Sequence, residues 1–156
     1  HLSDSFWVPS KIEKMGFSVD PYDENSSKAG WTSHMFNMPG PSFGFWIRPH
    51  EFILAATTEV VKLGSNLAGQ VSGKSSLGRH GLFVENAGFI DPGFEGPITL
   101  ELYNAGPNRF MLTPSMPICQ LALSLLDEPA NPGYQGKYVG ASGPQLSRYH
   151  LNERLS

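Results

Sequence analysis

Two carboxylates stand where a water-activating group can act. Asp91 closes the apolar run 87–91 and precedes Pro92-Gly93, and Glu101 lies at the centre of the alternating segment 98–103. A carboxylate held in a polar pocket can take a proton from water and return it to a leaving group. Asp91 can equally serve only to start the Pro-Gly turn, and Glu101 can simply face solvent. On the residues alone, both interpretations of each carboxylate remain open.

A second candidate is the segment 73–79, which reads Gly73-Lys74-Ser75-Ser76-Leu77-Gly78-Arg79. Glycines let backbone N–H groups approach an anion, hydroxyls donate to its oxygens, and the two cations offset its charge. The segment is therefore a candidate phosphate-binding loop, although the order of a P-loop is absent. A solvated turn fits the same composition.

Composition argues against several other classes of protein. A net charge of -3 provides no basic surface for nucleic acid, and no stretch approaches the ~20 apolar residues of a membrane span, so we expect neither partner. Cys119 is the sole cysteine, and the five histidines fall at no ligand spacing, so we expect no zinc site. With no intramolecular disulfide and no leader segment, we expect a cytoplasmic protein.

The elements that must position these residues are strands. The chain has 17 Gly, 13 Pro and 12% aromatic residues, which favours an all-β fold of short strands joined by turns. We expect one domain over 1–156, with 129–156 as a C-terminal arm and, since the chain begins at His1 without Met, an incomplete N-terminus. Segment 73–79 is expected to be a loop or a single helical turn. The predicted strands are 43–47, 52–54, 57–61, 67–71, 98–103 and 117–126, the last buried on both faces.

Several motifs occur together, in order and at fixed spacing, and in combination they resemble the dCTP deaminase family, including its bifunctional deaminase–dUTPase members. The motifs are 73–79, Gly81-Leu82, 87–96, 98–102, Asn104, Gln120-Leu121, 134–138, Gly143-Pro144 and Ser147-Arg148. The resemblance implies a distorted jelly-roll-like barrel of the dUTPase-like (β-clip) type. It also implies a homotrimer whose active sites are shared between subunits.

The resemblance further implies roles for individual residues. Glu101 would be the general base that activates water for attack on C4 of cytosine, with Ser75 and Arg79 around the ring and the Ala87 carbonyl holding the water. Asp91 would be a further catalytic residue, because dUTPases use the equivalent aspartate to orient water toward the α-phosphorus. The implied nucleotide contacts are Lys74, Ser76, Leu77, Gly78, Thr99, Leu100, Gln120, Tyr134 and Lys137.

The implied substrate is dCTP or dUTP, with Mg²⁺ bound through the triphosphate and no zinc. Deamination of dCTP to dUTP, possible continuation to dUMP, a plain dUTPase, and a nucleotide sensor without activity are the alternatives. Phe94 and Glu101 favour the deaminase, because dUTPases usually carry Tyr at the first position and an apolar residue at the second. The chain departs from the family pattern at Asn86, Ser115 and Ala141.

Overall fold

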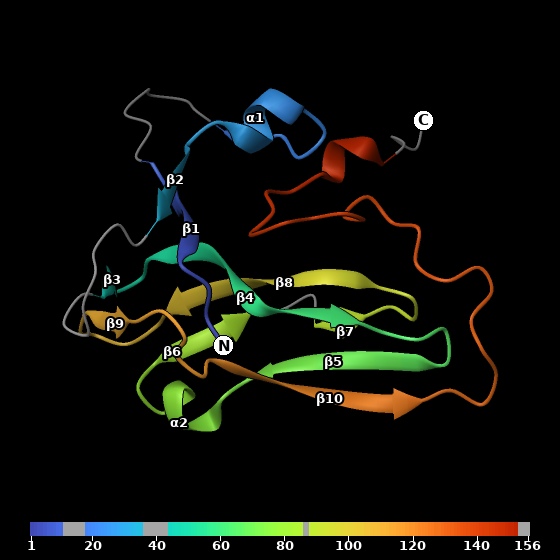
Figure 1. The fold of residues 1–156 in the computed structure, drawn as a ribbon. Helices are drawn as coiled ribbons and strands as arrows, with labels where there is room; N and C mark the ends of the chain where they lie inside the picture. Colours follow the sequence, from blue (N-terminus) through green and yellow to red (C-terminus); the bar gives the residue numbers. More distant parts are fainter. Residues whose placement is uncertain (11–17, 36–43, 86–87, 153–156) are drawn as a thin grey trace.

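The computed structural model describes residues 1–10, 18–35, 44–85 and 88–152. Strands dominate it, so the expected all-β class is confirmed (Figure 1). The strands are β1 (Ser5–Pro9), β2 (Trp31–Met35), β3 (Phe45–Ile47), β4 (Phe52–Lys62), β5 (Leu67–Gly73), β6 (Leu82–Glu85), β7 (Phe89–Ile90), β8 (Glu95–Asn104), β9 (Phe110–Leu112) and β10 (Cys119–Leu125). The helices are α1 (Glu24–Lys28), α2 (Ser75–Gly78) and the 3-10 turn η1 (Tyr149–Leu151).

The strands form three sheets. The largest has the order β2-β1-β4-β8-β6, a second has the order β10-β5-β7, and β3 pairs with β9 alone. Figure 1 shows the pair β4–β8 running above β5 and β10 across the width of the molecule. Among the described residues, no helix is long and apolar enough to cross a membrane.

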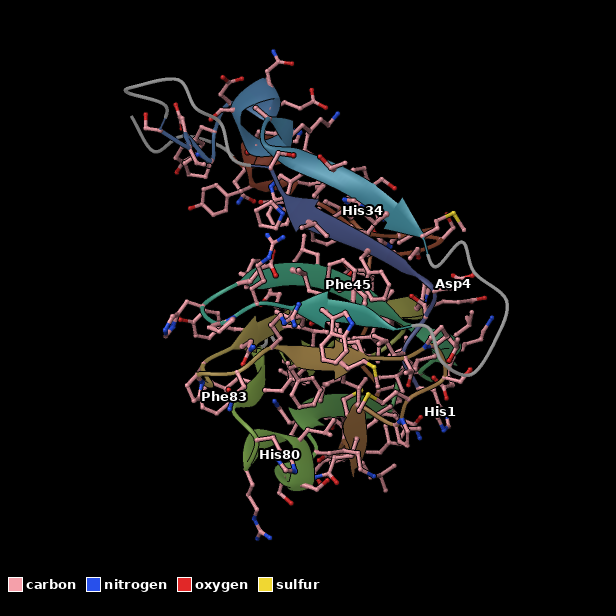
Figure 2. The ribbon with its side chains drawn as sticks, turned by 90° about the vertical axis from the view of Figure 1, so that its left-hand side faces the viewer. His1, Asp4, His34, Phe45, His80 and Phe83 are labelled. Carbon is pink, nitrogen blue, oxygen red and sulfur yellow. The ribbon has the colours of Figure 1, made fainter. Side chains whose placement is uncertain are left out.

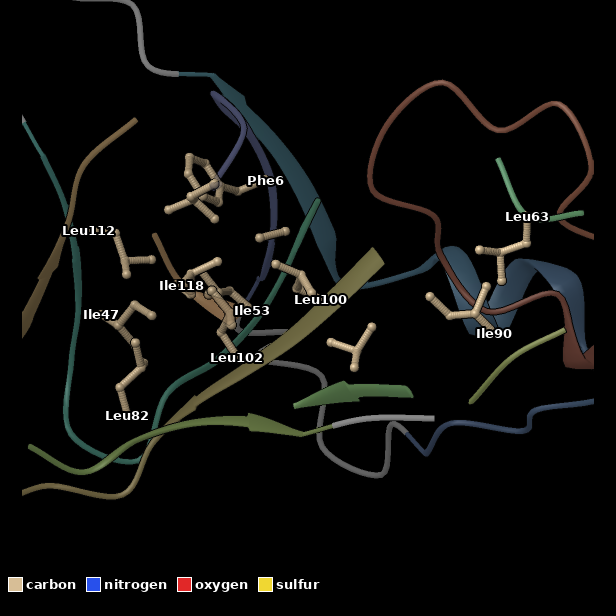
Figure 3. Packing of buried hydrophobic residues seen from close by; sticks show 13 residues of the cluster. Phe6, Ile47, Ile53, Leu63, Leu82, Ile90, Leu100, Leu102, Leu112 and Ile118 are labelled. Atoms are coloured by element: carbon tan, nitrogen blue, oxygen red, sulfur yellow. The ribbon is translucent and has the colours of Figure 1, made fainter. Parts of the chain in front are cut away.

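The alternation predicted for 98–103 is observed in β8. Leu100 and Leu102 are buried, whereas Thr99, Glu101 and Tyr103 on the opposite face are only partly buried. Leu100 and Leu102 pack in the core with residues from β1, β3, β4, β5, β6 and β9 (Figure 3). Because successive side chains of a strand point to opposite faces, burying Leu100 and Leu102 places Glu101 on the other face.

The predicted strands 52–54 and 57–61 are one continuous strand, β4, so the division between them is wrong. The register with β8 is irregular between Ala56 and Val60, directly after the predicted break at 55–56. The Thr57 hydroxyl bridges it, because it donates to the Glu59 carbonyl at 2.8 Å and accepts from the Ile98 N–H at 2.9 Å. A side chain therefore replaces ladder bonds at the bulge, and the strand continues.

The prediction that 117–126 is buried on both faces is wrong. β10 is an edge strand that pairs with β5 on one side only, and Leu123 and Leu125 are 54% and 74% exposed in the single chain. Phe89 of β7, in the same sheet, is 60% exposed. An apolar sequence predicts burial, but among the described residues of a single chain no element covers these side chains.

Asn104 fixes the end of β8 and is fully buried. Its Nδ2 donates to the carbonyls of Ile47 at 3.1 Å and Asn108 at 2.8 Å, and its Oδ1 accepts from the Gly106 N–H at 3.0 Å. One carboxamide thus joins the end of β3, the end of β8 and the loop that follows it. A buried polar group with this many partners stabilises the fold only as long as all of them are satisfied.

We predict that Asn104→Ala lowers the free energy of unfolding by about 2–4 kcal/mol, because three backbone groups lose their partner, two of them in buried bonds. The control is Asn108→Ala. The Asn108 side chain is exposed, and the substitution keeps the backbone carbonyl that accepts from Asn104, so the free energy of unfolding should change by less than about 0.5 kcal/mol. Urea unfolding of both variants measures the difference. Equal stability of the two variants would show that Asn104 does not hold the end of β8.

Candidate functional site

Predicted site residues from separate parts of the chain line one cavity of about 620 Å³. Its walls come from β4, β7 and β8, from residues 19–31, and from the chain after β10. Five residues assigned to the site from sequence line it together. They are Asp91, Thr99, Leu100, Glu101 and Tyr134.

Glu101 reaches this cavity because of its register. It stands opposite Leu54 of β4 and opposite Glu85 of β6, so a strand pairs with β8 on each side. Thr99 shares its face of the strand, and both side chains are partly buried. The Glu101 side chain thus borders a cavity and is only partly exposed, which favours the pocket alternative.

Asp91 both starts a turn and borders the cavity. Its carbonyl accepts from the Phe94 N–H at 3.1 Å, and Gly93 has φ 85°, a conformation that favours glycine at this turn position. The side chain is exposed and lines the same cavity as Glu101. The turn interpretation and the site interpretation are compatible.

The chain that follows β10 crosses back over the Asp91 turn. The Tyr134 N–H donates to the Pro92 carbonyl at 2.8 Å, and the Tyr134 ring lies 5.7 Å from that of Phe94. A side chain at Gly93 would lie 3.0 Å from the Tyr134 nitrogen, so the close approach also requires glycine. This contact holds Tyr134 at the cavity.

Further along, the same segment is tied to strands β1 and β8. Trp7 Nε1 donates to the Pro144 carbonyl at 2.9 Å, and the Gln145 N–H donates to the Thr99 hydroxyl at 3.1 Å. At its end, the rings of Tyr149 and Tyr22 meet edge to face at 5.1 Å, next to α1. Figure 1 shows this segment passing around the right side of the molecule to η1, which lies near α1.

The residues of 73–79 lie elsewhere. Of the described residues that line the cavity, none belongs to this segment. Lys74 caps the single helical turn α2, which agrees with the alternative of a helical turn, and the side chains of Ser75, Ser76 and Arg79 are exposed. In Figure 2, His80, which follows α2, lies at the bottom of the molecule, far from His34 on β2 at the top. Within one chain, Ser75 and Arg79 therefore do not line the cavity that Glu101 lines.

The remaining predicted contacts also lie outside the cavity. Gln120 of β10 bonds to the Ser72 hydroxyl at 3.3 Å, and Lys137 donates to Asn152 at Oδ1 with its ammonium 5.9 Å from the centre of the Tyr149 ring. Leu77 and Gly78 belong to α2, and a Cβ at Gly78 would meet nothing within 4 Å. Ala87 and Asn86 lie outside the described residues.

Several cavity residues were not predicted from the sequence. The pair Trp31 and Phe52, whose rings meet at 6.1 Å, forms an apolar wall, and Tyr138 and Gln145 of the C-terminal segment line the cavity as well. The region 1–42 has no clear periodicity that predicts which of its aromatic residues reach a site. The signal for Tyr138 was its place in the motif 134–138.

The chemistry of the described residues is that of carboxylates and hydrogen-bonding groups. Within the described ranges, no group of three or more His, Cys, Asp and Glu side chains is placed to hold a metal ion. Burial raises the pKa of the half-buried Cys119 thiol, so this thiol is held in its unreactive protonated form. The candidate for proton transfer at the cavity is therefore a carboxylate.

Comparison with known proteins identifies the family. A family model described as dCTP deaminase-like matches residues 8–126, more than half of the chain. A protein of Persephonella marina named "dCTP deaminase, dUMP-forming" is 52% identical over 70% of this chain and 61% of its own length. A protein of Aquifex aeolicus with the same name is 50% identical over 71% of this chain and 62% of its own length. The chain thus spans about three fifths of the length of these relatives.

A solved structure agrees on the fold. The crystal structure of a 2'-deoxycytidine 5'-triphosphate deaminase from Agrobacterium tumefaciens matches 80% of this chain and 37% of its own, with a TM-score of 0.54 and 16% identity. At that identity the likeness concerns the fold alone. With the family model covering β1 to β10, the chain belongs to the dCTP deaminase-like family.

Proposed function

We propose that the protein hydrolyses the exocyclic amino group of dCTP, with Glu101 as the base that activates water. The observation that carries the proposal is the cavity in which Glu101, Thr99, Asp91 and Tyr134 meet, between β8 and the C-terminal segment. Its volume of about 620 Å³ falls within the range of small-molecule sites. The name "dCTP deaminase, dUMP-forming" of relatives at about half identity supports the same substrate.

The reaction requires two proton transfers, which one carboxylate can perform. Glu101 takes a proton from water while the oxygen adds to C4 of the cytosine ring. The protonated carboxyl then gives that proton to the amino group, the C4–N4 bond breaks and ammonia leaves. The added hydroxyl becomes the C4 carbonyl of uracil as its proton moves to N3. A base near the reacting atom is effective only when it is held in position, and the central place of Glu101 in the β4–β8–β6 sheet supplies this.

We further propose that Asp91 acts in a second step, in which water attacks the α-phosphorus of dUTP and releases dUMP and diphosphate. Asp91 lines the same cavity as Glu101, so both steps can occur on one bound nucleotide. The words "dUMP-forming" in the names of the relatives support this second step. Mg²⁺ would enter with the substrate, bound by phosphate oxygens and water.

The complete site, in this proposal, requires a second copy of the chain. Lys74, Ser75, Ser76 and Arg79 are exposed or partly exposed and lie outside the cavity of their own chain. The apolar side chains of Leu123, Leu125 and Phe89 are exposed in one chain, which supports association of copies. A closed homotrimer would bring the segment 73–79 of one subunit to the cavity of the next.

We predict that Glu101→Gln lowers the rate of dCTP deamination by about 10²–10⁴-fold, because the amide keeps the shape of the side chain but accepts no proton from water. Leu100 and Leu102 keep their core packing, so thermal stability should change little. Rates are followed by ammonia release, with nucleotide binding measured by calorimetry as the control. Near-normal turnover by the variant would contradict the assignment of Glu101.

We predict that two inactive variants restore each other in mixed assemblies. Arg79→Ala and Glu101→Gln should each be inactive alone, since each removes one half of every shared site. Co-expressed subunits should regain activity at about a quarter of the sites, where an intact Arg79 meets an intact Glu101. Light scattering of the wild type should show a trimer. A monomer, or mixed assemblies without activity, would refute the shared site.

We predict that deamination survives a zinc-selective chelator and depends on Mg²⁺. The described residues provide no metal-binding cluster, and the ion is expected to be carried by the triphosphate. Initial rates with and without each treatment measure this. Loss of activity that only added zinc reverses would contradict the carboxylate mechanism.

A further inference from the structure

Gln145 lies beside the proposed base. Its backbone N–H donates to the Thr99 hydroxyl at 3.1 Å, and its side chain is one of those that line the cavity. Thr99 and Glu101 are two residues apart on the same face of β8, a separation of about 6–7 Å along a strand. Gln145 is therefore joined to the face of β8 that carries Glu101, and both residues line one cavity.

The orientation of this carboxamide is fixed on both sides. Arg148 Nη2 donates to its Oε1 at 3.0 Å, and its Nε2 donates to the Gly143 carbonyl at 3.1 Å. A half-turn of the amide would set two donors together and two acceptors together, so both bonds would be lost.

Arg148 is itself held in place. Its Nη1 donates to the Lys137 carbonyl, its guanidinium lies 5.6 Å from the centre of the Tyr138 ring, and its backbone N–H donates to the Tyr138 hydroxyl at 3.1 Å. Tyr138 lines the same cavity. The amide is therefore positioned by groups that do not depend on a bound ligand.

A fixed amide distinguishes the two pyrimidines. A glutamine side chain offers two N–H groups and two oxygen lone pairs, and the bonds to Arg148 and Gly143 use one of each. One N–H and one lone pair thus remain at neighbouring atoms. Cytosine presents a donor at N4 beside an acceptor at N3, and uracil presents the reverse order at O4 and N3. One amide orientation can pair with only one of these two edges.

We propose that Gln145 binds the N3–N4 edge of cytosine and makes the site prefer cytosine over uracil nucleotides. This inference rests on the proposed function, because Glu101 acts at C4, the carbon that bears N4 and adjoins N3. The carboxamide oxygen accepts from N4–H and the free N–H donates to N3. Gln145 is thus a specificity-determining residue supplied by the C-terminal segment.

The test is Gln145→Ala, measured with the full chain and Mg²⁺. The KM for dCTP should rise about 10-fold, because one well-placed pair of hydrogen bonds is lost, and kcat should change less. The inhibition constant of α,β-imido-dUTP, a uridine nucleotide with a phosphate link that water does not cleave, should not rise. The control is Gln135→Ala, an exposed glutamine of the same segment that does not line the cavity, and it should leave both constants unchanged.

The alternative is that Gln145 acts only by anchoring Arg148 and the segment around it. On that alternative, Arg148→Ala would weaken both nucleotides by the same factor. If Gln145 binds the cytosine edge, Arg148→Ala frees the amide to turn and should raise the KM for dCTP more than the inhibition constant of α,β-imido-dUTP. If Gln145→Ala also raises both constants equally, or raises neither, the inference is overturned while dCTP turnover by the wild type still supports the proposed function. A wild-type chain that leaves dCTP unchanged overturns both.

Discussion

The antiparallel pairing of β4 with β8 is the interaction on which the rest of the structure depends. It sets Leu54 opposite Glu101 and buries Leu100 and Leu102, so the carboxylate must lie on the cavity side of the sheet. The Thr57 hydroxyl bonds to the Ile98 N–H where the register is irregular, and Asn104 fixes the end of β8 by its bond to the Ile47 carbonyl. A shift of one residue in this register would bury Glu101 and expose the core leucines. The position of the proposed base is therefore a consequence of core packing.

The second constraint is the contact of the C-terminal segment with this strand pair. The bonds from Tyr134 to the Asp91 turn and from Gln145 to Thr99 bring residues from the end of the chain onto β8. These are few hydrogen bonds on partly buried groups, and such segments open at lower free energy than the sheet beneath them.

The sequence predicted much of the fold and only part of the site. Strict alternation in 98–103 specified a strand and its two faces, because burial of one face forces the other outward. The length of β4 was underpredicted, since a bulge bridged by the Thr57 hydroxyl has no distinctive pattern. The exposure of β10 in a single chain could not be predicted, because the sequence pattern of an apolar strand is the same whether the strand is buried by its own chain or by another copy. Gln145 was missed, because its place beside Thr99 is created by a contact between residues 46 positions apart.

In the proposed reaction, a water activated by a carboxylate of the cavity converts a cytosine nucleotide. The most direct measurement is to incubate the chain with dCTP and Mg²⁺ and to separate the products by anion exchange. The account predicts that dCTP disappears with release of ammonia and that the uracil nucleotide recovered is dUMP, with diphosphate in equal amount. Recovery of unchanged dCTP, while dUTP supplied separately is cleaved or also left intact, would contradict it.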